Sequence, residues 1–203
     1  MMKKILAILL LCTIAFGASA EFRWGPTAGV NINKFYWKQH LVQTDQLAGF
    51  NVGVMGELMI PGIGFGIDMA VKYDMRGARV HWNDQKVWAS QGLGVQNLYF
   101  HTLSVPVNLR FKWTRMQGFE NYLAPIVFVG PTFNFNLAHT KNDAIEDPGA
   151  SVGLQTGLGV EVFKRYQVTA GYMWGLCYDF RTVQLDNFSA HASGWFVNLA
   201  VLF

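Results

Sequence analysis

The sequence predicts an all-β fold: an eight-stranded, antiparallel, up-and-down transmembrane β-barrel preceded by a cleavable signal peptide. Three observations support this prediction. Eight segments of about ten residues or more alternate between apolar and polar residues, as a strand with two different faces requires. Only 14% of the 203 residues are charged, against about 25% in typical soluble domains. Beyond residue 20, no apolar run reaches the roughly 18 residues that a membrane helix needs.

Residues 1–20 are interpreted as a secretory signal, which leaves residues 21–203 as one barrel domain. Two lysines form its positive start, an apolar core follows, and Ala-Ser-Ala at 18–20 fits a cleavage site. The core is too short for a membrane anchor. A lipoprotein signal at Cys12 is the weaker alternative, because Leu11 stands where a small residue is expected.

The first three predicted strands are Trp24–Ile32, Phe50–Met59 and Phe65–Asp74. In each of them apolar side chains occupy most alternate positions, opposite residues that are mainly Gly, Ala, Thr, Asn or charged. The connection at residues 60–64 holds a proline and two glycines, which indicates a tight turn between the second and third strands.

The fourth strand, Tyr99–Trp113, shows the alternation most fully. One face carries Tyr99, His101, Leu103, Val105, Val107, Leu109, Phe111 and Trp113. The other carries Phe100, Thr102, Ser104, Pro106, Asn108, Arg110 and Lys112. At about 3.3 Å per residue the strand spans roughly 50 Å, while some 9–11 tilted residues suffice to cross the hydrocarbon. Its aromatic ends are therefore expected at the two edges of the bilayer.

Four further strands are predicted over Tyr122–Asn136, Ser151–Phe163, Tyr166–Phe180 and Gly194–Phe203. Two prolines weaken the first of them, because proline removes a hydrogen-bond donor from the sheet. The connections after the second, fourth and sixth strands are short, and the others are longer. This pattern is typical of bacterial outer-membrane barrels, with short periplasmic turns, long external loops and both termini in the periplasm.

The distribution of charge indicates which face is outside. A soluble lipocalin-like barrel would also alternate, but with its apolar face inward. Here the apolar face of the predicted strands carries no Asp, Glu, Lys or Arg, and lipid excludes a midplane Lys or Arg at about 2–4 kcal/mol. The lumen is therefore expected to hold Glu57, Asp68, Lys72, Asp74, Arg110, Lys112, Glu161 and Asp179.

Aromatic residues at the strand ends fit two membrane girdles. Toward the turns lie Trp24, Trp113, Tyr166 and Phe203, and toward the loops lie Tyr73, Tyr99, Phe135, Tyr178 and Trp195. Among the lumen charges, Glu57, Arg110 and Glu161 stand at similar heights and are expected to form an ion-pair network. We favour a structural plug over a gate for small solutes or protons, because side chains fill an eight-stranded barrel.

The segment Leu103–Phe111, LSVPVNLRF, resembles the L-x-I-P-L-x-L-K segment of the PorT-like outer-membrane β-barrel family of Bacteroidetes. Trp24–Asn33 is similar to that family's first strand, and Tyr122–Phe135 and Gly157–Gly175 to later ones. The resemblance implies a porin-like outer-membrane barrel. PorT itself is implied in type IX secretion and gingipain export, and this chain looks short beside it, so only fold and location are carried over.

Other chemistry has little support. The histidines at 40, 81, 101, 139 and 191 lack ligand spacing such as H-x-x-x-H, even with Asp84, Asp143, Glu146 or Asp186 nearby, so no metal and no cofactor are expected. No nucleophile motif is present, and Cys177 is expected to face the lumen as a small residue. The net charge of +3, or +1 without the signal, gives no basic excess for nucleic acid.

The expected role is structural or interactive, without catalysis, in the lipid bilayer of the outer membrane. The barrel-assembly machinery is the expected partner during insertion, with terminal Phe203 as its recognition signal. The long loops carry Phe35, Tyr36, Trp37, Trp82 and Trp88, which either contact a protein or glycan partner or fold over the barrel mouth. The alternatives are a small-solute porin, an accessory barrel of type IX secretion and, with less support, an outer-membrane barrel enzyme.

Overall fold

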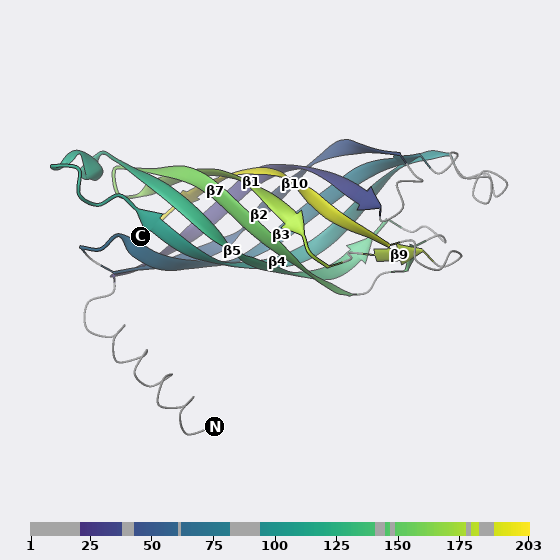
Figure 1. Cartoon of the computed structure of the whole chain (residues 1–203), viewed down its shortest axis with the longest axis horizontal. Coiled ribbons are helices and arrows are strands. Elements are labelled where there is room, and N and C mark those ends of the chain that lie inside the picture. The colour runs from purple at the N-terminus through teal and green to yellow at the C-terminus, as the bar shows by residue number, and fades with distance from the viewer. Residues whose placement is uncertain are drawn as a thin grey trace, which may run out of the picture.

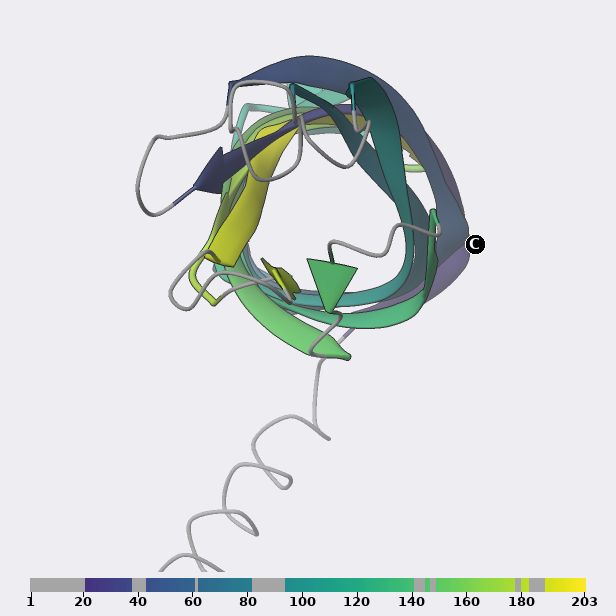
Figure 2. The same ribbon diagram turned by 90° about the vertical axis from the view of Figure 1, so that its right-hand side faces the viewer.

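Eight long strands close into an antiparallel barrel (Figure 1, Figure 2). The computed structural model describes residues 21–37, 43–60, 62–81, 94–140, 145–146, 149–177, 180–182 and 189–203. The barrel strands are β1 (Glu21–Trp37), β2 (Thr44–Met59), β3 (Phe65–His81), β4 (Val95–Lys112), β5 (Leu123–His139), β7 (Ala150–Val162), β8 (Tyr166–Gly175) and β10 (Ser189–Val201). Each pairs with the next, and β1 pairs with β10, from Thr27 opposite Ala200 to Trp37 opposite Ala190. The predicted all-β, eight-stranded barrel is confirmed.

Two short strands at the loop end are not members of the closed ring. β9 (Phe180–Thr182) pairs with β10, and β6 (Ile145–Glu146) pairs with β9. A 3-10 helix, η2 (Phe119–Asn121), lies in the connection between β4 and β5. No helix within the described residues is long and apolar enough to cross a bilayer.

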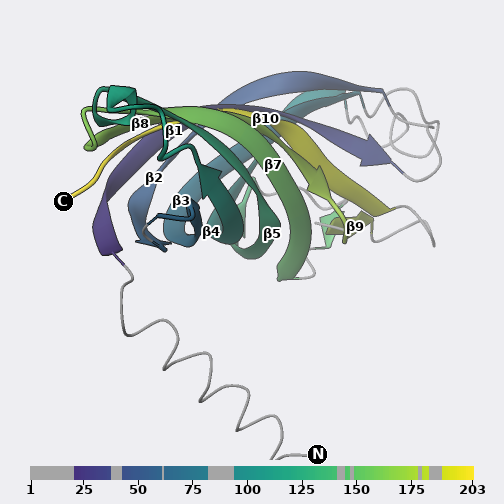
Figure 3. The same cartoon turned by 60° about the vertical axis from the view of Figure 1, so that its left-hand side comes forward.

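The short connections gather at one end of the barrel, where Phe203 also lies (Figure 1, Figure 3). Between β2 and β3, Gly62 and Gly64 have φ values of 78° and 84°, a left-handed conformation that glycine adopts without steric cost. Backbone hydrogen bonds join Trp24 and Phe203 in both directions, at 3.3 and 2.9 Å, so the first and last strands are fixed together at this end.

The strands are longer than predicted, mainly toward the loop end. β1 runs to Trp37 and β3 to His81, and the outward positions of these extensions include Lys34 and Arg79. The predicted strand Tyr166–Phe180 is too long, since β8 ends at Gly175. Cys177 follows in a bend and is exposed, so its expected lumen position is wrong. Phe163 belongs to the β7–β8 turn with a φ of 52°.

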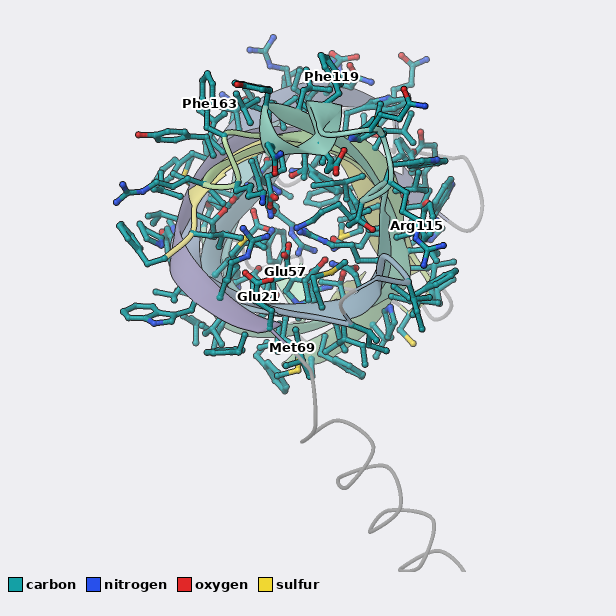
Figure 4. The ribbon with its side chains drawn as sticks, turned by 90° about the vertical axis from the view of Figure 1, so that its left-hand side faces the viewer. Glu21, Glu57, Met69, Arg115, Phe119 and Phe163 are labelled. Carbon is teal, nitrogen blue, oxygen red and sulfur yellow. The ribbon has the colours of Figure 1, made fainter. Side chains whose placement is uncertain are left out.

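The two faces are arranged as the charge pattern predicts. Val127 and Leu199 are exposed on the outside, whereas Arg110 and Glu161 are buried inside. Viewed along the barrel from the turn end, Glu57 lies within the ring and Met69 on its outer surface (Figure 4). The folded core is therefore the lumen, and the apolar residues form the outer surface.

Glycines make room for two phenylalanine rings inside the lumen. Gly157 and Gly171 are opposite each other on β7 and β8. A Cβ at Gly157 would lie 2.5 Å from the Phe128 ring, and one at Gly171 would lie 2.8 Å from the Phe196 ring. The two rings lie 6.2 Å apart. The small residues of the polar face therefore let large side chains enter a narrow barrel.

Candidate functional site in the barrel lumen

A network of charges fills the lumen near the turn end, with Glu57 of β2 at its centre. The Glu57 side chain is fully buried. Its Oε1 accepts hydrogen bonds from Arg23 Nη2 at 2.5 Å and Lys112 Nζ at 2.7 Å. Its Oε2 accepts hydrogen bonds from Gln167 Nε2 at 2.7 Å and from Arg110 Nη1. One carboxylate thus joins strands β1, β2, β4 and β8.

Glu161 of β7 shares three of these donors. Its Oε2 accepts hydrogen bonds from Arg23 Nη2 at 2.6 Å, Lys112 Nζ at 2.8 Å and Gln167 Nε2 at 2.8 Å. The structure therefore brings Glu57, Arg110 and Glu161 into one network, but Arg110 contacts Glu57 and not Glu161 in the hydrogen bonds of the described residues. Lys112 and Arg23 make the link between the two carboxylates.

Arg23 is the member that the sequence reasoning missed. The first strand was expected to begin at Trp24, which left Arg23 outside the barrel. The structure begins β1 at Glu21. Phe22 and Trp24 are both exposed on the outer surface, so the alternation that turns Arg23 inward was already present in the sequence.

Asp68 of β3 extends the network toward the middle of the barrel. Its Oδ2 accepts a hydrogen bond from Arg110 Nε at 2.8 Å, and its Oδ1 accepts one from Asn108 Nδ2 at 2.6 Å. We call the set Arg23, Glu57, Asp68, Arg110, Lys112, Glu161 and Gln167 the turn-side network. It contains three cations and three anions, so the buried charges compensate one another, as burial in a low dielectric requires.

A second polar layer lies nearer the loops. The Asp74 carboxylate accepts hydrogen bonds from Asn31 Nδ2 at 2.7 Å and Arg76 Nε at 2.9 Å. Arg76 Nη2 also donates to Ser104 Oγ at 2.7 Å and Asn134 Oδ1 at 2.6 Å. Asp74 and Arg76 form a balanced pair that crosses the lumen from β3 to β1, β4 and β5. Arg76 was not among the expected lumen charges, because the predicted strand ended at Asp74.

Buried apolar side chains close the loop end of the lumen. Phe35 and Trp37, expected in an exposed loop, occupy inward positions of β1 and are almost completely buried. The Phe35 and Phe100 rings contact edge to face with centroids 5.5 Å apart. Tyr36, between them, is partly exposed. For this pair, folding into the barrel mouth is the alternative that the structure supports. Trp82 and Trp88 lie outside the described residues.

The predicted girdle residues lie at the outer surface wherever the structure describes them. Trp24, Trp113, Tyr166, Phe203, Phe135 and Trp195 are exposed, and Tyr73 and Tyr99 are half-buried. Tyr178 of the girdle and Asp179 of the lumen set lie outside the described residues. Tyr172 makes edge contacts with Trp174 and with Trp195 of the predicted girdle, at 4.9 and 5.0 Å between centroids.

The histidines are dispersed. The Tyr73 hydroxyl lies 2.5 Å from His101 Nδ1, and His81 Nε2 lies 3.0 Å from Asp45 Oδ2. His139 and His191 stack on aromatic rings of β4 and β1. In the described part of the chain, no group of three or more His, Cys, Asp or Glu side chains is placed to hold a metal ion. His40 lies outside it.

Comparison with known structures and sequences agrees with this architecture. OprG, an outer membrane protein of Pseudomonas aeruginosa, matches with a TM-score of 0.51 and 9% identity over 91% of this chain and 95% of its own. Ail of Yersinia pestis, solved with the heparin analogue sucrose octasulfate, has a TM-score of 0.45 and 13% identity over 90% of this chain and 99% of its own. Neisserial surface protein A has a TM-score of 0.48 and 13% identity over 91% of this chain and 99% of its own.

No curated protein matched the sequence. The likeness to OprG supports the fold alone, because the identity is low. The family described as "Outer membrane protein beta-barrel domain" matches residues 5–199, nearly the whole chain. Together with the closed barrel and an outer face without charges across its middle, this match shows that the chain belongs to the outer membrane protein beta-barrel domain family and is an integral protein of the outer membrane.

Proposed function

We propose that this protein is a closed outer-membrane barrel whose role is structural or interactive, not conductive or catalytic. The observation that carries the proposal is the turn-side network. Six charges and a glutamine from strands β1, β2, β3, β4, β7 and β8 meet across the lumen with their charges in balance. An open pore would instead leave such groups separated by water.

The free volume in the lumen supports the same reading. Two cavities of about 40 and 20 Å³ lie beyond the turn-side network. A water molecule needs about 10–15 Å³ of such space, so these cavities hold a few waters at most. Passage of a sugar or an amino acid would require the network to open. This argument favours a plug over the small-solute porin.

Conductance across a planar lipid bilayer tests the proposal. Purified protein is expected to give no steady channels. Arg110→Ala, which removes a member of the network, is expected to introduce leak current or reduce stability. Arg79→Ala, at an exposed arginine of the loop end, serves as the matched control. Steady, ion-selective channels in the unaltered protein that disappear in Arg110→Ala would contradict the plug and favour a gated porin.

The topology belongs to the proposal. We place the short turns and both barrel termini in the periplasm, because short periplasmic and long external connections are the rule in bacterial barrels. The hydrogen bonds between Trp24 and Phe203 support a common side for the two ends. Insertion by the barrel-assembly machinery is part of the same proposal. In a Cys177→Ser background, labelling of Asp45→Cys at the loop end and Arg115→Cys at the turn end in intact cells should mark only the first.

The interaction role is assigned to the loop end, where a protein or a glycan is the proposed partner. In a rigid barrel with a filled lumen, the loops are the part of the protein that can differ in shape and sequence to bind a partner. Loops on rigid scaffolds commonly carry function. Crosslinking in intact outer membranes, followed by purification, tests this assignment. Recovery of secretion components would favour the PorT-like accessory role that the resemblance of Leu103–Phe111 implies. Recovery of the barrel alone under all conditions would contradict an interaction role.

A further inference from the structure

Two cavities inside the lumen share one lysine, Lys72, in their linings. The larger, of about 40 Å³, lies next to the turn-side network, and the smaller, of about 20 Å³, lies next to the Asp74–Arg76 layer. Lys72, Gln155 and Phe196 line both. We call the two cavities together the Lys72 chamber. It lies between the two polar layers, and members of both line it.

Lys72 has no polar partner among the described residues. Its side chain comes from β3, and the residue is 8% exposed. Its Nζ lies 5.7 Å from the centre of the Phe196 ring, a contact that offers only weak compensation for a buried ammonium group. It makes no hydrogen bond and no ion pair with the part of the chain that the structure describes. A buried charge without a partner is costly, so a charged Lys72 calls for a bound counter-charge in the chamber.

The carboxylates on either side of Lys72 are already engaged. Asp68 accepts hydrogen bonds from Asn108 and Arg110. Asp74 accepts hydrogen bonds from Asn31 and Arg76. Neither lies within the 4.0 Å of an ion pair with Lys72. The excess positive charge therefore stays on Lys72.

The charge balance of the lumen gives the same result. The described inward-facing side chains of the two polar layers and the chamber include five cations and four anions. The cations are Arg23, Lys72, Arg76, Arg110 and Lys112, and the anions are Glu57, Asp68, Asp74 and Glu161. Each of the other four cations has a carboxylate partner, which leaves one positive charge uncompensated, at Lys72.

The chamber also contains oxygens without a donor. Asn198 Oδ1 on the larger cavity, and Asn51 Oδ1 and Thr132 Oγ1 on the smaller, are buried and have no hydrogen-bond partner among the described residues. The amide oxygens require donors, which water supplies and an anion does not, whereas the Thr132 hydroxyl can also donate a hydrogen bond. The chamber therefore has to hold water as well as a group that compensates Lys72.

We propose that the Lys72 chamber binds one hydrated monovalent anion of halide size. The anion accepts a hydrogen bond from Lys72 Nζ and balances its charge, while one or two waters bridge it to the orphaned oxygens. The volume fits, since the larger cavity has room for about three water-sized particles. A divalent oxyanion is excluded by its size and because its charge would exceed the single positive charge available.

Bromide is the probe, because its anomalous scattering distinguishes it from water. Crystals of the full chain, purified in detergent with bromide in place of chloride, should show an anomalous peak in contact with Lys72 Nζ. The peak should be absent from Lys72→Met and retained in the matched control Lys34→Met, whose lysine stands at the outer surface of β1 near Tyr36. Water density at Lys72 without an anomalous peak, or a peak that persists in Lys72→Met, would overturn the proposal.

A solution measurement covers binding outside the crystal. The unfolding midpoint in urea is compared in bromide and in gluconate at equal ionic strength, since gluconate is too large for the chamber. The unaltered protein and Lys34→Met should unfold at higher urea in bromide by the same margin, and Lys72→Met or Lys72→Gln should lose that margin. Equal midpoints of the unaltered protein in both salts would refute the anion site.

Discussion

Substitution of Glu57 by glutamine removes the central charge of the turn-side network without changing the shape of the side chain. Glu57 accepts hydrogen bonds from Arg23, Arg110, Lys112 and Gln167, and its side chain is fully buried. In Glu57→Gln one side-chain oxygen remains, and the other becomes an amide that itself donates. Two of the four hydrogen bonds are lost, and the donors that made them then face the new amide NH2 group, which is itself a donor.

The expected cost follows from this count. Hydrogen bonds to charged groups contribute about 1.5–3 kcal/mol each, so the loss of two lowers the free energy of unfolding by roughly 3–6 kcal/mol. Removal of one partner from a buried ion pair gives a comparable figure of roughly 3–5 kcal/mol. A change of this size exceeds the effect of most single substitutions, which fall between about 0.5 and 3 kcal/mol.

Urea unfolding of the barrel in lipid vesicles, followed by tryptophan fluorescence, measures this change. The matched control is Glu21→Gln, which also removes a carboxylate near Arg23. The Glu21 side chain is 66% exposed and its Oε1 lies 3.9 Å from Arg23 Nε, so its loss should cost at most about 1 kcal/mol. Adding Lys112→Gln to Glu57→Gln restores the charge balance and should recover part of the lost stability. Equal stabilities of Glu57→Gln and Glu21→Gln would refute a network centred on Glu57.

Three further predictions concern other parts of the barrel. Met69→Lys, at the middle of the outward apolar positions Phe65–Tyr73 of β3, should lower the free energy of unfolding in vesicles by about 2–4 kcal/mol, while Val95→Lys at the loop end should cost about 0–1 kcal/mol. Equal costs would contradict the assigned bilayer position. Gly157→Val should cost roughly 1–3 kcal/mol, because its Cβ would lie 2.3 Å from the Ala170 carbonyl oxygen and 2.5 Å from the Phe128 ring; the double variant with Phe128→Leu should recover only the part due to the ring in the same assay. Backbone N–H donors, its own first, hold the pKa of Glu120 in the β4–β5 turn below its ordinary value of 4.5, so the turn is stabilised above pH 4.5 and loses this contribution as the pH falls through the lower folded value. Titration of the turn's amide resonances by NMR should give a midpoint below 4.5 that vanishes in Glu120→Gln, and a midpoint at or above 4.5 would refute it.

The sequence predicted best what the bilayer constrains most. Lipid tolerates no charge on the outer face, so the alternation between the girdles is nearly free of exceptions and defines strands such as Phe65–Asp74. Lipid also requires every backbone group to be paired, which makes a closed barrel the only solution for an apolar chain without membrane helices. Strand number, antiparallel order and the inward position of Arg110 and Glu161 all follow from these two constraints.

The sequence predicted less well where the bilayer constrains nothing. Above the loop-side girdle β1 continues through Phe35 and Trp37, and an aromatic residue at every position hides the two-residue period. The hydrogen-bond and ion-pair partners inside the lumen could not be predicted either. The alternation indicates which face a residue occupies and its approximate height along the barrel, but not which side chain lies opposite it across the lumen. Lys72 illustrates the limit: its inward position was predicted, but its lack of a partner depends on Arg76 and Arg110 occupying the nearby carboxylates.

The lumen, not the outer surface, gives this barrel its specific register. Outside, an apolar side chain facing lipid gains little from any particular neighbour, because lipid tails are as apolar as the side chains. A shift of β1 by one residue against its neighbours would turn Arg23 outward and Trp24 into the lumen. That shift would place a charge near the lipid face and leave Glu57 and Glu161 without a shared donor. The network therefore penalises a shifted register at β1, the strand where the ring closes. This explains why the lumen retains buried charges, although apolar side chains could fill the same volume.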